Sequence, residues 1–251
     1  MAQQQSTVPE PSELGAKSYW DSRYELELKN FEEFGDEGDI WFGRSAEKRS
    51  QFQKTFSNMR IVDLSLSLFS VTFRMIGYIT SNIEKSANIL DLGCGNGSLL
   101  RRLSTLGYSK LTGVDYCPAA IELASRLSCR DQESSRSSIV FKVVDILSSD
   151  RRVFLGQYEV ILDKGTWDAM SLSNERDSRL MCYKATVIET LVCYGKFIIF
   201  SCNFTRDELC QMFDDGSSLI FIKEIPSQHS IVFGGNTGVT STGVVFEKRL
   251  Q

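Results

Sequence analysis

Short apolar runs alternate along the chain with stretches whose apolar residues recur at helical spacing. The apolar runs predict strands near 89–92, 111–114, 140–144, 159–163 and 196–201. The stretches between them predict helices near 98–106, 118–127, 177–193 and 205–213. Two more strands, 218–224 and 242–248, follow with only a loop between them and should pair antiparallel. This order predicts an α/β protein with a seven-stranded, mostly parallel sheet, a terminal antiparallel hairpin and helices on both faces.

A glycine-rich turn joins the first predicted strand to its helix. Gly93, Gly95 and Gly97 allow the backbone to turn sharply and to approach a ligand where a Cβ atom would clash. Asp91 precedes the turn, and Asp115 ends the next strand, where a carboxylate can accept hydrogen bonds from ribose hydroxyls. A plain tight turn would explain one or two glycines, but not three together with both acids.

Two cofactor classes use such a turn. Dinucleotide sites space their glycines G-x-G-x-x-G and place a pyrophosphate at the helix N-terminus, whereas this chain has G-x-G-x-G. The carboxylate of Asp91 would repel a pyrophosphate but attract the ammonium group of a methionine moiety. The charge of Asp91 therefore favours S-adenosylmethionine over NAD. The Y-x-x-x-K spacing usual in NAD-dependent oxidoreductases is also absent from the sequence.

Four carboxylates follow predicted strands. Ligands of open α/β sheets bind beyond the carboxyl ends of the strands, and these acids all stand at such ends: Asp91, Asp115, Asp145 and Asp163. A position in an exposed loop would explain any one of them. Together they predict one cleft lined with carboxylates.

Composition agrees with one enzyme domain. The chain has 251 residues and 42% hydrophobic content, which predicts a single domain at 13–251 after a polar, disordered tail at 1–12. The net charge of −4 makes nucleic acid a disfavoured partner, and no signal peptide begins the sequence. Seven cysteines without C-x-x-C spacing indicate a reducing compartment, here the cytoplasm. With one histidine, His229, the sequence predicts no metal site, and Cys94 is interpreted as a small turn residue rather than a nucleophile.

The chain resembles the class I, seven-β-strand methyltransferases, which have a Rossmann-like fold. Within that superfamily it is similar to the lysine methyltransferases that act on translation elongation factor 1-alpha. Four blocks carry this closer match: Y-W-D-S-R-Y-E-L-E at 19–27, G-D-I-W-F-G at 38–43, L-D-K-G-T-W-D-A at 162–169 and S-C-N-F-T-R-D-E-L at 201–209. The D-K-G-T part is far more specific than the cofactor turn, which the whole superfamily shares.

The resemblance implies a role for each matching position. Asp91 and the glycines would hold the methionine end of S-adenosylmethionine, with Cys94 and Asn96 from the same turn. Asp115 and the adjoining Tyr116 would lie at the ribose. The adenine ring would be flanked by Asp145 and Ile146.

The resemblance also implies an N-terminal segment, 13–43, that covers the cofactor. Trp41 and Tyr19 would belong to it, either touching the cofactor or anchoring the segment to the sheet edge. We expect the protein to be a monomer that binds neither nucleic acid nor a membrane.

The acceptor side of the site would lie after the fourth strand. Asp163 would face the transferred methyl group, and we count it with Thr166 as catalytic. A lysine must lose its proton, which desolvation or a carboxylate such as Asp163 can assist. Asp163 and Asp168 have a second interpretation, as caps of the helix or turn that follows. The block lacks the N/D-P-P-Y/F turn of enzymes that methylate bases, so a base is not the expected acceptor.

Other acceptors stay open at this point, namely another protein or a small-molecule amine. A non-catalytic scaffold that binds the cofactor is a further alternative. An acidic stretch at 25–39 is either a solvated face or a surface that attracts a basic protein. It comprises Glu25, Glu27, Glu32, Glu33, Asp36, Glu37 and Asp39.

Residues 50–73 depart from the family pattern. Leu64, Leu66 and Leu68 alternate with serines, and Val71 and Phe73 continue the alternation after a slip, which is typical of a strand. The run is too short and too rich in hydroxyl groups for a membrane anchor. It predicts an atypical insertion, or an error in the gene model.

Overall fold

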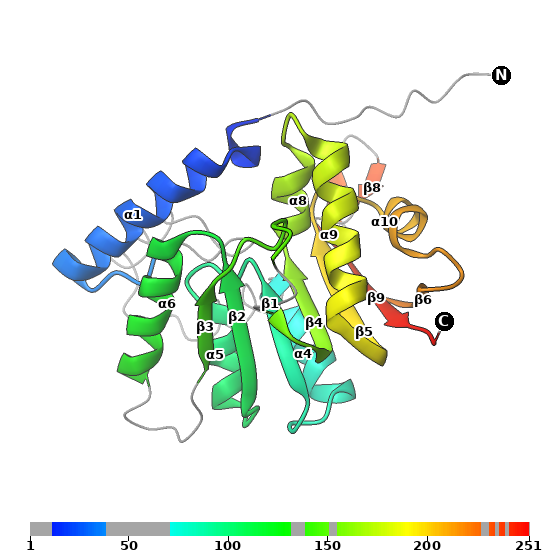
Figure 1. The fold of residues 1–251 in the computed structure, drawn as a ribbon, viewed down its shortest axis with the longest axis horizontal. Helices are drawn as coiled ribbons and strands as arrows, with labels where there is room; N and C mark the ends of the chain where they lie inside the picture. The colour runs from blue at the N-terminus through cyan, green and yellow to red at the C-terminus, as the bar shows by residue number, and fades with distance from the viewer. Residues whose placement is uncertain are drawn as a thin grey trace.

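The computed structural model describes residues 12–38, 71–131, 139–150, 155–226, 231–233, 236–238 and 241–250. Seven strands form one sheet in the order β3-β2-β1-β4-β5-β9-β6 (Figure 1). They are β1 (Asn88–Leu92), β2 (Lys110–Asp115), β3 (Val140–Val143), β4 (Tyr158–Lys164), β5 (Leu191–Ser201), β6 (Leu219–Ile225) and β9 (Thr242–Lys248). Six strands run in one direction, and β9 is antiparallel to both of its neighbours, β5 and β6. The predicted fold class is confirmed.

The strand order places the topological switch of the sheet between β1 and β4. From β1 the chain moves outward to β2 and β3, then crosses back and continues from β4 to β5. The carboxyl ends of β1 and β4 therefore diverge into loops on opposite sides, which leaves a crevice where open α/β sheets bind ligands.

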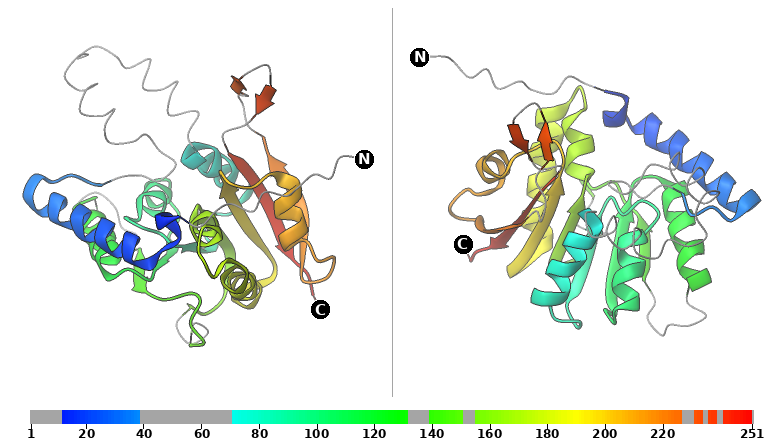
Figure 2. Two further views of the ribbon diagram at one scale, coloured as in Figure 1. Left: turned by 90° about the horizontal axis from the view of Figure 1, so that it is seen from above. Right: turned by 180° about the vertical axis from the view of Figure 1, so that it is seen from behind.

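Helices cover both faces of the sheet (Figure 2). On one face α4 (Val71–Asn82) and α5 (Ser98–Thr105) pack onto Ile89, Val160 and Leu162. On the other, α8 (Thr166–Ser171), α9 (Arg176–Thr190) and α10 (Arg206–Phe213) cover Leu90 and Ile161. Because side chains of a strand alternate between faces, central strands that are buried on both sides become continuous apolar runs. This is why the sequence indicated these strands clearly.

The N-terminal segment forms a helix that the sequence analysis did not predict. After a short 3-10 helix (Glu13–Gly15), α1 (Lys17–Phe34) packs against α6 (Pro118–Asp131) (Figure 1). Its buried positions, Tyr24 and Glu27, are few. An apolar periodicity was therefore too weak to reveal it.

Two segments differ from their predicted form. Val71 to Phe73 begin α4 rather than continuing a strand, because Val71, Met75 and Ile79 recur every fourth residue and are buried. The rest of 50–73 lies outside the described residues. The connection between β6 and β9, expected to be a loop, contains the paired strands β7 (Ile231–Phe233) and β8 (Asn236–Gly238).

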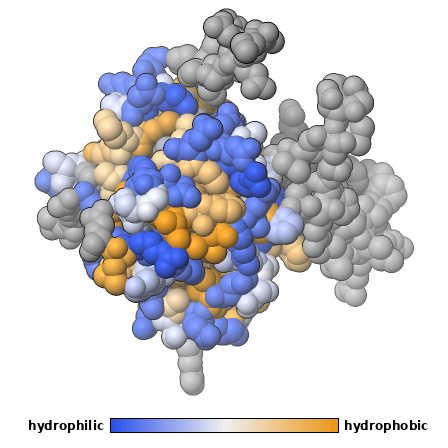
Figure 3. Space-filling model, turned by 90° about the vertical axis from the view of Figure 1, so that its right-hand side faces the viewer, coloured by the Kyte–Doolittle hydropathy of each residue, from blue (hydrophilic) through white to orange (hydrophobic). Residues whose placement is uncertain are grey.

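The side formed by α10 and the outer strand β6 mixes polar and apolar residues (Figure 3). Lys223 and Glu224 are exposed on β6. Charged side chains on an edge strand discourage pairing with another chain. Within the described ranges, no helix has the length and apolar character needed to span a bilayer.

Candidate cofactor site

A cavity of about 250 Å³ opens at the carboxyl ends of the central strands. It brings together ten of the residues that the sequence analysis assigned to the site, namely Asp91, Gly93, Cys94, Gly95, Asn96, Asp115, Tyr116, Asp145, Ile146 and Thr166. Gly97 and Asp163 do not line it. Trp41 lies outside the described residues, and Tyr19 packs edge-on against Trp20 with ring centroids 5.2 Å apart, away from the cavity lining.

The glycine-rich turn has the backbone form that its sequence suggested. Gly93, Gly95 and Gly97 have φ angles of 67°, 53° and 70°, in the left-handed region that favours glycine. A Cβ atom on Gly93 would collide with the hydroxyl of Thr166, and one on Gly95 with the hydroxyl of Tyr24. The turn is therefore held between the D-K-G-T block and α1.

Asp91 supplies a buried carboxylate at this turn. It is only 3% exposed, and burial raises its pKa to about 7; Lys164 opposes this rise, while Asp163 and Asp115 add to it. A carboxylate in this setting is stabilised by a cationic ligand group. This part of the cavity therefore suits the ammonium group of an amino acid.

Asp115 and Asp145 shape the neighbouring loops. The two carboxylate oxygens of Asp115 accept hydrogen bonds from the backbone N–H groups of Gly95 (3.1 Å) and Cys117 (3.0 Å), and burial raises its pKa to about 6. Asp145 is exposed and accepts a hydrogen bond from the backbone of Leu147 at 2.9 Å. Asp115 thus ties the glycine turn to the loop after β2, and its role at the ribose stays a prediction.

Asp163 lies on the other side of the sheet from its expected place. It is fully buried, and its carboxylate accepts hydrogen bonds from the backbone of Thr166 (3.0 Å) and Trp167 (2.9 Å) and from the hydroxyl of Tyr183. Two residues earlier, Ile161 faces α9, and side-chain alternation places Asp163 on that same face. Its contacts match the helix-cap interpretation, and the expected place facing the transferred methyl group does not agree with this geometry.

Thr166 and Asp168, both in the L-D-K-G-T-W-D-A block at 162–169, line the cavity. The hydroxyl of Thr166 donates to the carbonyl of Leu92 at 2.7 Å, so it fastens α8 to the end of β1. Asp168 is 4% exposed and accepts hydrogen bonds from the Ser201 hydroxyl and from the backbone N–H of Cys202 at 2.7 Å. Asp168 therefore holds the turn after β5 rather than the one that follows it in sequence.

The cavity also contains residues that the sequence analysis did not assign to the site, among them Trp20, Tyr24 and Lys164. Trp20 and Tyr24 come from α1, and their spacing of four residues places them on one face of that helix. Lys164 comes from the end of β4; burial lowers its pKa, while Asp91 and Asp163 act to raise it. Lys164 could have been found from the sequence, because it adjoins Asp163. Adjacent strand residues point to opposite faces, so only one of the two can face the cavity.

The acidic stretch is largely paired within the chain. Glu27 pairs with Arg23 (2.9 Å), Glu32 with Arg126 (2.7 Å), Glu33 with Lys29 (3.8 Å), and Glu37 with Arg101 and Arg130 (3.0 Å to Arg101). Asp39 lies outside the described residues. These pairs support intramolecular packing of the stretch rather than attraction of a basic partner.

Comparison with known proteins identifies the family. A family model described as a methyltransferase domain matches residues 83–233, which include the glycine turn and the D-K-G-T block. The chain belongs to this methyltransferase family. It is 35% identical over 240 residues to the zebrafish (Danio rerio) "EEF1A lysine methyltransferase 2", covering 95% of this chain and 89% of the relative. It is 38% identical to "Protein-lysine N-methyltransferase efm4" of Schizosaccharomyces pombe, covering 96% of each chain.

Solved structures agree on the fold of the methyltransferase. Magnesium protoporphyrin IX methyltransferase from Synechocystis, with bound S-adenosylmethionine, is 10% identical and superimposes with a TM-score of 0.54 over 90% of this chain and 97% of that one. The N-methyltransferase NodS from Bradyrhizobium japonicum, with S-adenosylhomocysteine, gives 0.53 at 15% identity over 91% and 98%. The cofactor of the methyltransferase is S-adenosylmethionine.

The cavity fits this cofactor. Gly93 and Gly95 line the cavity and hold the turn in its left-handed conformation, and buried Asp91 offers the negative charge that a methionine ammonium group needs. Asp91 and the turn would hold the methionine end, Asp115 the ribose, and Ile146 one face of the adenine.

Proposed function

We propose that this methyltransferase transfers methyl groups to a lysine side chain of translation elongation factor 1-alpha. The observation that carries the proposal is the extent of the similarity to relatives named for this activity. Identities of 34–38% cover about 95% of the chain in five relatives: three from fish and mammals are named EEF1A lysine methyltransferase 2, and two from yeasts are named protein-lysine N-methyltransferase. The similarity therefore spans α1 and the D-K-G-T block as well as the shared cofactor turn.

A lysine acceptor sets a physical requirement. At its reference pKa near 10.4, presenting a neutral amine at pH 7 costs about 4.6 kcal/mol. A buried cavity lowers that cost, because loss of water disfavours the ammonium form. The bound cofactor supplies an electrophilic methyl group on a positively charged sulfur, so the chain must align the amine and exclude water.

We assign the orientation of the amine to Asp168 instead of Asp163. Asp168 lines the cavity, and its carboxylate is fixed by Ser201 and Cys202. Burial raises the pKa of Asp168, which makes this carboxylate a better proton acceptor than an exposed one. Thr166 acts through Leu92, as a positioning residue.

The compartment proposed for this reaction is the cytoplasm. All seven cysteines lie in the described part of the chain and are free thiols, as in proteins of reducing compartments. The monomeric state stays a prediction.

Peptide mass spectrometry of purified elongation factor 1-alpha tests the proposal. After incubation with the methyltransferase and S-adenosylmethionine, we expect a gain of methyl groups on lysine, and none with the Asp91→Asn variant. A wild-type enzyme that binds the cofactor but leaves every lysine unchanged would contradict the acceptor while leaving the fold and cofactor intact.

A further inference from the structure

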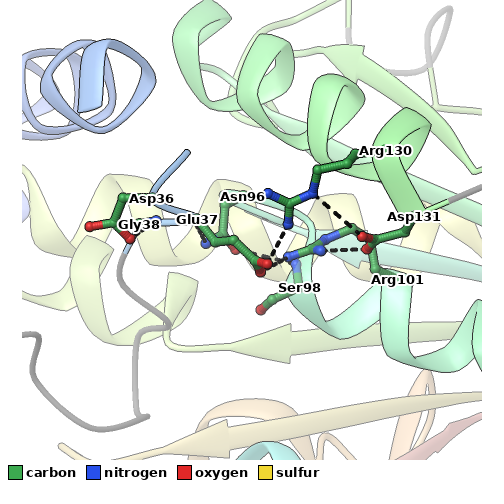
Figure 4. Close-up of polar contacts among 8 residues, drawn as sticks. All are labelled: Asp36, Glu37, Gly38, Asn96, Ser98, Arg101, Arg130 and Asp131. Atoms are coloured by element: carbon green, nitrogen blue, oxygen red, sulfur yellow. Dashed lines mark hydrogen bonds and ion pairs between the residues drawn. The ribbon is translucent and has the colours of Figure 1, made fainter. Parts of the chain in front are cut away.

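A cluster of charged residues joins the end of α1 to the two helices beside the cofactor turn (Figure 4). After α1 the chain reverses at Gly35, whose φ of 69° is left-handed, and residues 36–38 return toward α5 and α6. The carboxylate of Glu37 then pairs with Arg101 of α5 at 3.0 Å and with Arg130 of α6. Arg101 also pairs with Asp131 at 2.6 Å. None of these residues lines the cavity.

The same segment is bonded directly to the cofactor turn. Asn96 lies within that turn, is 4% exposed and lines the cavity. Its side-chain amide donates to the backbone carbonyl of Glu37 at 2.9 Å, and its side-chain oxygen accepts from the backbone N–H of Ser98 at 3.2 Å. One side chain therefore connects the start of α5, the turn and Glu37.

The other contacts of this segment lead back to α1. A Cβ atom on Gly38 would collide with the carboxylate of Glu27, so the returning chain packs closely on the buried side of the helix. One helical turn before Glu27, Tyr24 places its hydroxyl against Gly95, and Trp20 lines the cavity. Glu37 is thus linked to α1 through the returning segment and to the turn through the bond from Asn96 to its backbone carbonyl.

The charges favour this closed arrangement. Burial opposes ionisation of Glu37, but hydrogen bonds and charge interactions with Arg101 and Arg130 hold its pKa below the ordinary value. The side chain of Arg101 is only 11% exposed, so this pair is less screened by solvent than the surface pairs of α1. Loss of the carboxylate would leave Asp131 as the ion-pair partner of Arg101 within the described part of the chain.

We propose that Glu37 is a positioning residue for the cofactor, which holds α1 closed against the glycine-rich turn through Arg101, Arg130 and Asn96. It touches neither the cofactor cavity nor the reacting atoms. Its effect falls on the affinity for the cofactor, because Trp20, Tyr24 and Asn96 contribute to the cavity only while α1 and the turn stay together. The inference concerns the cofactor half of the site and holds for any acceptor.

Calorimetric titration with S-adenosylhomocysteine tests this role in the full chain. We expect Glu37→Gln to weaken binding about ten-fold, within the range of coupling between distinct sites. The matched control is Glu32→Gln, because Glu32 joins α1 to α6 through Arg126 but both side chains are about half exposed and neither contacts the turn. That control should bind with the wild-type dissociation constant, and both variants should melt within about 3 °C of the wild type.

Two further readouts separate positioning from a general loss of stability. At saturating S-adenosylmethionine, Glu37→Gln should keep the wild-type kcat while its KM for the cofactor rises. Arg130→Gln, which removes the partner on α6, should weaken S-adenosylhomocysteine binding in the same direction. The proposal would be overturned if Glu37→Gln and Arg130→Gln both bound with wild-type affinity, or if Glu37→Gln and Glu32→Gln lost affinity equally. A wild-type chain that binds no S-adenosylhomocysteine would instead overturn the cofactor assignment.

Discussion

At the scale of single residues, the acids at the strand ends have separate tasks that follow from the faces they occupy. Asp91 reaches the cavity, where the charge of Lys164 partly offsets the effect of burial, while both oxygens of Asp115 are used to hold the loops together. Asp163 is directed to the opposite face, where it receives three donors. Of these three acids, Asp91 is therefore the best placed to respond to a cationic ligand.

The pH dependence of cofactor binding should report the ionisation of Asp91. Its pKa of about 7 means that the carboxyl group is largely protonated at pH 6 and becomes ionised as the pH rises. Because only the ionised form attracts the ammonium group, affinity for S-adenosylhomocysteine should increase about five- to ten-fold between pH 6 and pH 7.5. Calorimetry at the two pH values measures this, and Asp91→Asn should bind weakly with a flat profile. An equal slope in wild type and variant would assign the titration to another group.

At the scale of secondary structure, buried strands could be predicted from sequence, whereas elements that depend on tertiary contacts could not. The chain passes from α9 to β5 at Leu191, although 177–193 fits a helix, because Leu191 pairs with Tyr158 of β4. The helical form of α1 is stabilised by contact with α6, a partner about a hundred residues away.

The residues of the site likewise fall into those that could be predicted from the sequence and those that depend on tertiary contacts. The glycine turn and its acids could be predicted because a local backbone conformation demands glycine, and most of these residues do line the cavity. The direction of Asp163 depends on the register of β4 in the sheet, which its own sequence does not contain. Trp20 and Tyr24 reach the site only through the packing of α1.

Asp163 should prove to be a structural residue that joins β4 to α8 and α9. In Asp163→Asn, an amide NH₂ group takes the place of one acceptor oxygen and faces an N–H or O–H group that donated to that oxygen. The lost hydrogen bond should lower the free energy of unfolding by about 1–3 kcal/mol. Chemical denaturation measures this, and the exposed Asp177→Asn on α9 serves as a control expected within about 0.5 kcal/mol of wild type. Affinity for S-adenosylhomocysteine should change little. A variant as stable as wild type that has lost methyl transfer would instead support a catalytic Asp163.

At the scale of the whole molecule, three distant parts of the sequence meet around one cavity. The glycine turn lines the cavity together with Trp20 and Tyr24 of α1 and with Thr166 and Asp168 of the block at 162–169. The methyltransferase family model matches both the turn and the D-K-G-T block, whereas α1 lies only in the longer match with the lysine methyltransferase relatives. We therefore expect acceptor choice to depend on α1 and the other parts that surround the cofactor rather than on the turn.

Transfer of labelled methyl groups in a whole-cell extract tests the proposed function most directly. The label would be found in a protein, in small molecules or nowhere, depending on whether the acceptor is a protein, a small molecule or does not exist. With wild-type enzyme and methyl-labelled S-adenosylmethionine, the account predicts that label concentrates in elongation factor 1-alpha and is recovered as methyllysine. Label in small molecules, in another protein, or in nothing at all would contradict it.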